Sequence, residues 1–187
     1  HIQGRATMGG NLCNGSPAAD SVPGLIAAGA TVTVPGPKGK REMPDEHVMV
    51  APRKLPIGAE DFVFTLFLPA RAANASDAYE RFIPGTEMDI AVVGAGVNLT
   101  LDDSGKITDA RVELVAVAPR PLLVKDAADA IIGTTLDDEA LKKLDAAAQA
   151  ACQPIDDKRG TVEYRTKVAG VLARRTAQTA YDRARNK

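Results

Sequence analysis

The feature that most constrains the fold is a strand, turn and strand pattern in the middle of the chain. Residues 89–101 are a long strand candidate in which apolar and polar residues alternate toward the end. The run at 102–105, Asp-Asp-Ser-Gly, predicts a hairpin turn into a second strand over residues 106–117. Gly94 and Gly96 interrupt the first strand, which is typical of a bulge or a close approach of another backbone. An antiparallel sheet is therefore expected here.

The last third of the chain has helical patterns. A first helix is expected over residues 125–132, before Gly133, and a long final helix is expected to begin at Thr161. Between them, Asp137 or Asp138 is an N-cap candidate for a helix with one apolar stripe, formed by Leu141, Leu144, Ala148 and Ala151. These patterns predict a three-stranded antiparallel sheet packed with a helical bundle.

The first part of the chain has shorter elements. Residues 31–34 and 62–68 are rich in β-formers, and a proline- and glycine-rich turn follows the first of them. Asp20 or Ser21 can cap a short helix that stops at Gly29. We therefore predict an α+β protein. A small mixed β/α subdomain covers residues 1–69, a small-residue linker covers 70–78, and a second domain covers 79–187.

Composition excludes several function classes. With 23 Lys and Arg against 24 Asp and Glu, the chain has no basic footprint for a nucleic-acid backbone. Aromatic residues make up 4% and Trp is absent, so stacking platforms are scarce. Two isolated cysteines, Cys13 and Cys152, and the absence of any apolar run near the length of a bilayer span favour a cytoplasmic protein.

The segment with the most chemical information is residues 7–20, called here the glycine segment. Gly9 and Gly10 lack a Cβ atom, so a phosphate can approach the main-chain N–H groups without a clash. Short polar side chains surround them, and Asp20 can accept from sugar hydroxyls. Taken alone, the same residues are also explained as a turn followed by an N-cap, because short glycine motifs are frequent by chance.

At these residues the chain resembles the flavoprotein (medium) subunits of molybdenum hydroxylases of the carbon monoxide and xanthine dehydrogenase type. The family motif T-x-G-G-[ND] reads Thr7-Met8-Gly9-Gly10-Asn11, and the small polar loop after it ends at Asp20. Two further stretches are similar to the family's C-terminal domain. They are Tyr79-Glu80-Arg81-Phe82 with residues 87–93, and residues 154–161 with Tyr164-Arg165.

The resemblance implies FAD as cofactor. It implies electron transfer from the iron-sulfur clusters of a small partner subunit to an external acceptor, beside a large molybdopterin subunit. The implied cofactor-binding residues are Thr7, Met8, Gly9, Gly10, Asn11, Asn14, Ser16, Asp20, Val63 and Arg81. Thr7 to Asn11 would cradle the pyrophosphate, Asp20 would bond a sugar hydroxyl, and Val63 would lie near the flavin rings.

Arg81 falls where the family commonly has lysine, close to the flavin edge. A cation there can stabilise a reduced, anionic flavin and raise its potential. A solvated surface arginine explains the same residue.

Two departures from the family pattern stand out. The family's A-G-G-[TQ]-[DS] type motif is absent, so the other wall of the site is expected outside this chain, and the chain alone is expected to be inactive. The run at residues 48–58 is also unlike the family segment and is expected to be a variant loop.

No residue is expected to act as acid, base, nucleophile or metal ligand, since only His1 and His47 offer an imidazole. Three functions stay open. The first is an FAD-binding electron-transfer subunit of an oxidoreductase complex, in which the flavin supplies the chemistry. The second is a cofactor-free assembly module that docks partner subunits, and the third is an unrelated nucleotide-binding protein.

Overall fold

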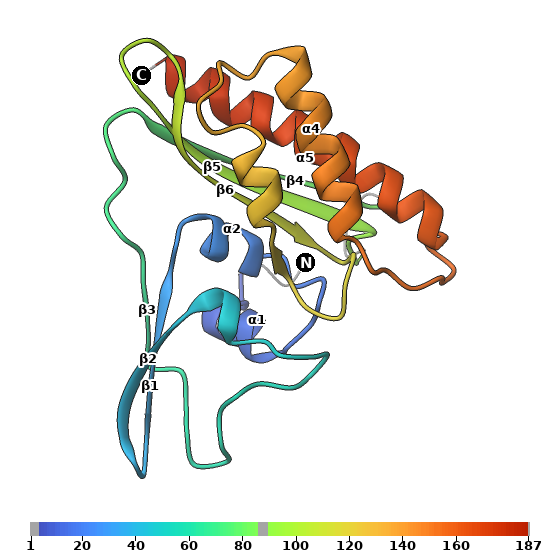
Figure 1. Cartoon of the computed structure of the whole chain (residues 1–187). Coiled ribbons are helices and arrows are strands. Elements are labelled where there is room, and N and C mark those ends of the chain that lie inside the picture. Colours follow the sequence, from blue (N-terminus) through green and yellow to red (C-terminus); the bar gives the residue numbers. More distant parts are fainter. Residues whose placement is uncertain (1–3, 86–89, 187) are drawn as a thin grey trace.

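The computed structural model describes residues 4–85 and 90–186 (Figure 1). Its N-terminal part runs from α1 to β3 and its C-terminal part from β4 to α5. The elements of the N-terminal part are α1 (Met8–Cys13), α2 (Val22–Ala27), β1 (Thr31–Gly36), β2 (Gly39–Pro44), the 3-10 helix η1 (Asp45–His47) and β3 (Thr65–Phe67). Those of the C-terminal part are β4 (Ala75–Phe82), β5 (Val93–Leu101), β6 (Ile107–Val115), β7 (Leu122–Leu123), α3 (Lys125–Asp129), α4 (Asp138–Ala151) and α5 (Val162–Arg185).

The N-terminal part contains a three-stranded antiparallel sheet of order β2-β1-β3. Val32 and Val34 of β1 are fully buried and pack with Leu12 of α1 and Ile26 of α2. The strand expected over residues 62–68 is regular only over β3. The N–H of Phe64 nevertheless donates to the carbonyl of Thr33 at 2.9 Å, so the preceding residues continue the edge irregularly.

The C-terminal part contains a four-stranded antiparallel sheet of order β4-β5-β6-β7. The predicted hairpin is confirmed as β5 and β6, joined by the turn at residues 102–105. The α+β class is also confirmed. The sheet has four strands where three were predicted, because the two residues of β7 pair with Glu113 and Leu114 at its edge.

The two faces of this sheet have different neighbours (Figure 1). Alternate residues of β5, such as Val97 and Leu99, belong to the apolar core that α3, α4 and α5 complete. On the opposite face, α2 packs against β5 and β6. A Cβ atom on Gly96 would lie 3.5 Å from both Ala27 Cβ and the Pro23 carbonyl oxygen of α2. The predicted close backbone approach at Gly96 is therefore confirmed.

The sequence offered N-cap residues for three helices, and two of these caps are formed in the structure. Asp137 accepts a hydrogen bond from the N–H of Ala140 at 2.9 Å, and Thr161 accepts from Tyr164 at 3.1 Å. Ser21 is the N-cap residue of α2 but makes no capping bond with its side chain, because its hydroxyl donates to Asn11 instead. The first C-terminal helix, expected to reach residue 132, ends at Asp129.

The segment at 70–78, expected to be a linker, is irregular only as far as Asn74, since β4 begins at Ala75. Ala75, Ser76 and Ala78 are small and buried, and the helix α5 packs against this strand. The 87–89 portion of the family-like stretch lies outside the described residues. Among the residues that are described, no helix is both long enough and apolar enough to cross a bilayer.

Candidate cofactor site

The start of the glycine segment is an exposed helical turn. Thr7 is the N-cap of α1, and its hydroxyl accepts a hydrogen bond from the N–H of Gly10 at 2.9 Å. The N–H groups of Met8 and Gly9 occupy the first two helical positions, where no intrahelical acceptor exists. No described residue accepts from either of them. These two donors are therefore available to an external acceptor.

The two glycines of this turn differ in their surroundings. A Cβ atom on Gly9 would have nothing within 4 Å, so the space beside Gly9 is open. A Cβ atom on Gly10 would lie 2.9 Å from the Thr7 hydroxyl oxygen. Gly10 is therefore required by the cap, while the open face at Gly9 leaves the main chain accessible to a ligand.

The polar side chains of the segment mostly hold the segment itself together. The Asn11 side-chain oxygen accepts from the N–H of Ser21 at 2.9 Å and from its hydroxyl at 2.7 Å. The Ser16 hydroxyl accepts from the N–H of Ala18 at 3.2 Å. Asn14 is exposed and forms the C-cap of α1 through its backbone. Of these three side chains, only Asn14 has no bonding partner among the described residues.

Two other loops support the glycine segment from outside. The Gly15 carbonyl accepts from the N–H of Arg53 at 2.7 Å, and the Pro17 carbonyl accepts from the N–H of Ala116 at 2.9 Å. Arg53 and Ala116 both have positive φ angles, 58° and 63°, which non-glycine residues rarely adopt. The segment at 48–58 therefore contributes a tight turn whose Arg53 N–H bonds the glycine segment at Gly15. No local sequence signal indicated this contact.

The end of the glycine segment contacts the C-terminal part directly. The Arg81 guanidinium on β4 donates to the Asp20 carboxylate at 2.7 Å, with both side chains partly exposed. The structure thus brings together the two charged residues that the sequence singled out. The Arg81 side chain is 31% exposed and the Asp20 side chain is 56% exposed, so both remain in contact with solvent.

Val63 lies apart from these polar groups. It is half-buried and packs against the apolar cluster that includes Leu12 of α1. Its neighbours Phe62 and Phe64 are 56% and 65% exposed and contact each other edge to face. The sequence singled out Val63, but these two exposed aromatic rings are the larger apolar surface on this edge of the small sheet.

A pocket of about 280 Å³ adjoins the glycine segment. It is lined by Ser16, Pro17 and Ala18, by the turn at Ala116, and by the loop at 153–159. Ile90 and Ile155 are exposed at its walls, and its lining is mainly apolar.

Partial burial raises the pKa of the Cys13 thiol, so this cysteine is less ionised than a free thiol at neutral pH.

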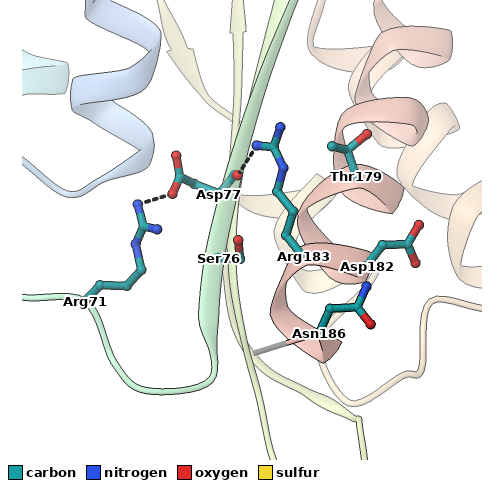
Figure 2. Close-up of a pocket in the computed structure, with 7 residues that line it drawn as sticks. All are labelled: Arg71, Ser76, Asp77, Thr179, Asp182, Arg183 and Asn186. Atoms are coloured by element: carbon teal, nitrogen blue, oxygen red, sulfur yellow. Dashed lines mark hydrogen bonds and ion pairs between the residues drawn. The ribbon is translucent and has the colours of Figure 1, made fainter.

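A larger open pocket of about 760 Å³ lies between β4 and the C-terminal end of α5 (Figure 2). Its two cationic side chains are already engaged, since Arg71 pairs with the Asp77 carboxylate and Arg183 donates to the Asp77 carbonyl at 2.9 Å. None of the glycine-segment residues lines it. Within the described ranges, no group of His, Cys, Asp and Glu is arranged to hold a metal ion.

Comparison with protein families gives two matches that together span nearly the whole chain. Residues 1–71 match the FAD binding domain in molybdopterin dehydrogenase, and residues 78–180 match the CO dehydrogenase flavoprotein C-terminal domain. The first match contains the entire glycine segment and Val63, and the second contains Arg81.

Individual relatives agree with these matches. The carbon monoxide dehydrogenase medium chain of Afipia carboxidovorans is 34% identical over 185 residues, covering 99% of this chain and 64% of the relative. The xanthine dehydrogenase FAD-binding subunit of Escherichia coli O157:H7 is 23% identical over 180 residues, covering 96% and 61%. The chain therefore spans somewhat less than two thirds of the length of these relatives.

Solved structures have the same fold. Reconstituted CO dehydrogenase from Oligotropha carboxidovorans superposes with a TM-score of 0.92 at 34% identity, over 97% of this chain and 63% of the other. Quinoline 2-oxidoreductase from Pseudomonas putida 86 superposes with a TM-score of 0.88, over 98% and 63%. Its identity is 22%, so this second likeness concerns the fold alone.

Proposed function

The chain belongs to the FAD-binding medium-subunit family of CO and xanthine dehydrogenases, and from this premise we propose that its glycine segment forms one wall of an FAD site in an electron-transfer subunit. The observation that carries the proposal is the match of residues 1–71 to an FAD-binding domain, with an open main-chain face at Gly9 inside it. Bound FAD would supply the redox chemistry, by accepting and releasing electrons.

The residues present fit the polar portion of a dinucleotide. The N–H groups of Met8 and Gly9 offer two main-chain donors beside a face with no side chain, which suits phosphate oxygens. Thr7 keeps the turn in shape through Gly10. Asn11 holds the turn against Ser21, and we assign it this positioning role in place of direct contact with the cofactor.

Asp20 and Arg81 would act as a pair at the sugar and flavin end. The Asp20 carboxylate accepts from Arg81 and still exposes an edge that can accept from a hydroxyl group. Arg81 supplies a permanent positive charge, and its contact with Asp20 fixes the orientation of the guanidinium group. Val63 would contribute an apolar surface, and Asn14 and Ser16 would lie beside the phosphates as secondary polar contacts.

We also propose partner subunits for this chain. The relatives are named as a medium chain of carbon monoxide dehydrogenase and as subunit alpha of a 6-hydroxypseudooxynicotine dehydrogenase complex. By analogy, an iron-sulfur small subunit would deliver electrons and a large molybdopterin subunit would carry the substrate chemistry.

A cofactor-free assembly role is the second candidate, and one observation favours it. Ile90 and Ile155 are 51% and 72% exposed beside the apolar pocket of 280 Å³, a surface suited to a protein partner. Capture of an iron-sulfur subunit by a protein that contains no flavin would support this role over the first.

The flavin proposal is tested on the protein at the full length that its gene encodes. We expect a yellow protein with a flavin absorption spectrum. Gly9→Ala should weaken FAD binding about tenfold or more, because its methyl group would stand between the main chain and the phosphate. Colourless protein after reconstitution with FAD would overturn the proposal.

The matched control is Gly24→Ala. Gly24 is also a helical glycine whose added Cβ would meet nothing within 4 Å. Both substitutions should therefore keep or slightly raise the stability of the fold, by up to about 1 kcal/mol. Only the change at Gly9 should reduce the flavin content.

A further inference from the structure

Two carboxyl side chains are buried without hydrogen-bond partners where the two parts of the chain meet. Asp45 begins η1 in the N-terminal part and is 1% exposed, and Glu113 on β6 in the C-terminal part is 0% exposed. None of their four carboxyl oxygens has a partner among the described residues. A buried carboxyl that no donor contacts is far more stable neutral than ionised.

Both residues border the helix α2. The Glu113 Oε2 atom lies 3.1 Å from the position that a Cβ on Gly96 would take, the same position that lies 3.5 Å from the Pro23 carbonyl oxygen of α2. The N–H of Asp45 donates to the carbonyl of Ala30, just beyond that helix, at 3.0 Å, and η1 packs against α2. The helix α2 follows directly on the glycine segment, so this junction helps to fix the position of that segment.

The other ionisable groups near the pair do not neutralise it. Arg111 on β6 donates to the Ile26 carbonyl at 2.9 Å and to the Glu46 carboxylate at 3.2 Å. Glu46 on η1 adds a third carboxyl group, which Arg111 already balances. The buried Tyr79 hydroxyl of β4 also has no hydrogen-bond partner among the described residues, and the charges of Asp20, Arg81 and Glu113 act on it.

We propose that Asp45 and Glu113 form a proton-dependent latch between the two parts of the chain. With both carboxyls protonated, β6 packs against α2, and Arg111 of β6 stays bonded to Glu46 of η1. Ionisation of the pair places two negative charges in this junction beside Glu46, where a single guanidinium is available. The repulsion between these charges then weakens the packing of α2 against β6 and η1. Because α2 follows the glycine segment directly, that segment is then held less firmly in place.

The direction of the pH dependence follows from the burial. Burial, and then the charge of Glu46, raises the pKa of Asp45 to about 7, and burial, then Asp45, raises the pKa of Glu113 well above its ordinary value. In the unfolded chain both groups titrate near pH 4. The unfolded state thus releases protons that the folded state keeps. The stabilisation is complete below about pH 4 and is lost as the pH rises through the folded pKa values.

The test compares the wild-type chain with Asp45→Asn, Glu113→Gln and the double variant, whose amides imitate the protonated carboxyls. In the wild type, the unfolding equilibrium constant should increase as the pH rises from 5 to 7. The increase should be about tenfold per pH unit for each proton that the folded state keeps and the unfolded state has released. The double variant should lack this component and unfold at a higher urea concentration than the wild type at pH 8. Asp109→Asn, at an exposed carboxyl on the same strand, should keep the wild-type pH dependence.

Infrared spectroscopy gives a second measurement, and its wild-type spectrum tests the protonation state even if a variant fails to fold. The wild-type protein at pH 6 should show the C=O stretch of protonated carboxylic acids, and either single variant should lose part of that band. Parallel pH dependence in the wild type and the double variant, without such a band, would overturn the latch. Stabilisation of the wild type by Ca²⁺ or Mg²⁺ that the double variant lacks would also overturn it, since the carboxyls would then be ionised ligands.

Discussion

The Arg81 guanidinium donates to the Asp20 carboxylate at 2.7 Å, and this ion pair joins the strand β4 to the end of the glycine segment. The two residues are 61 positions apart in the chain, and each belongs to a different family match. Because both side chains are partly exposed, solvent screens the attraction between them. The contact is therefore better suited to orienting Arg81 than to stabilising the fold.

Substitution of Arg81 should separate its effect on the flavin potential from its effect on the stability of the fold. Arg81→Gln should change the free energy of unfolding by less than about 1 kcal/mol, because exposed ion pairs contribute little. In flavin-loaded full-length protein it should make the midpoint potential of the flavin more negative, since a positive charge is lost. Arg81→Lys keeps the charge and is the matched control. Equal potentials in Arg81→Gln and the wild type would remove Arg81 from the proposed flavin environment, while urea unfolding reports the stability.

Arg165 is the buried cation that fixes the loop beside the apolar pocket. Its guanidinium is 4% exposed and donates to the carbonyls of Val92, Ala116 and Gly160 at 2.8, 3.3 and 3.4 Å, and to the Asp157 carboxylate at 2.6 Å. Arg165→Ala should cost about 3 to 5 kcal/mol of unfolding free energy, because these acceptors lose their donor. The loss of unfolding free energy in Arg165→Lys should lie between zero and the loss in Arg165→Ala, since an ammonium group cannot reach four separated acceptors. A cost below about 1 kcal/mol for the alanine variant in urea titrations would contradict this.

The helices α4 and α5 approach closely at Gly170. A Cβ atom there would overlap the Asp145 carboxylate, which itself bonds Gln149 and Arg174. Gly170→Ala should therefore destabilise the protein by about 1 to 3 kcal/mol, although alanine is the better helix former. In Asp145→Ala with Gly170→Ala the clash is gone, so the double variant should be more stable than the sum of the single changes predicts. Strict additivity in a urea-unfolding cycle would contradict the overlap.

Local patterns were sufficient for the parts of the fold that local chemistry determines. The turn at 102–105 predicted the β5–β6 hairpin, and the side chains of Asp137 and Thr161 cap the helices that the sequence placed after them. Gly96 indicated a close approach without naming the approaching element. These features depend on residues a few positions apart, where turn and capping preferences are strong.

Contacts between distant residues were not predictable in the same way. Arg111 bonds the Ile26 carbonyl across 85 positions, and Ala116 reaches Pro17 from another loop. Glu113 alternates along β6 with the polar residues Asp109 and Arg111, a pattern typical of an exposed strand face, yet it is buried where α2 packs against β6. For the cofactor site, family motifs named the residues, but the finding that Asn11 bonds Ser21 required the folded chain.

Asp61 should produce a pH dependence of opposite sign to that of Asp45 and Glu113. A hydrogen bond from Arg41, then one from the N–H of Gly58, lowers the pKa of the Asp61 carboxyl. Its stabilisation is thus present above the unfolded value of about 4 and is lost as the pH falls through the lower folded pKa.

Replacement of Asp61 tests this sign. Asp61→Asn should be less stable than the wild type at pH 7, and the difference should shrink as the pH falls below about 4. Urea midpoints at several pH values measure it. Glu60→Gln, at the exposed carboxyl next in the chain, is the control and should track the wild type throughout. If the difference between Asp61→Asn and the wild type stayed constant down to low pH, Asp61 would be acting through packing against Gly36 and not through its charge.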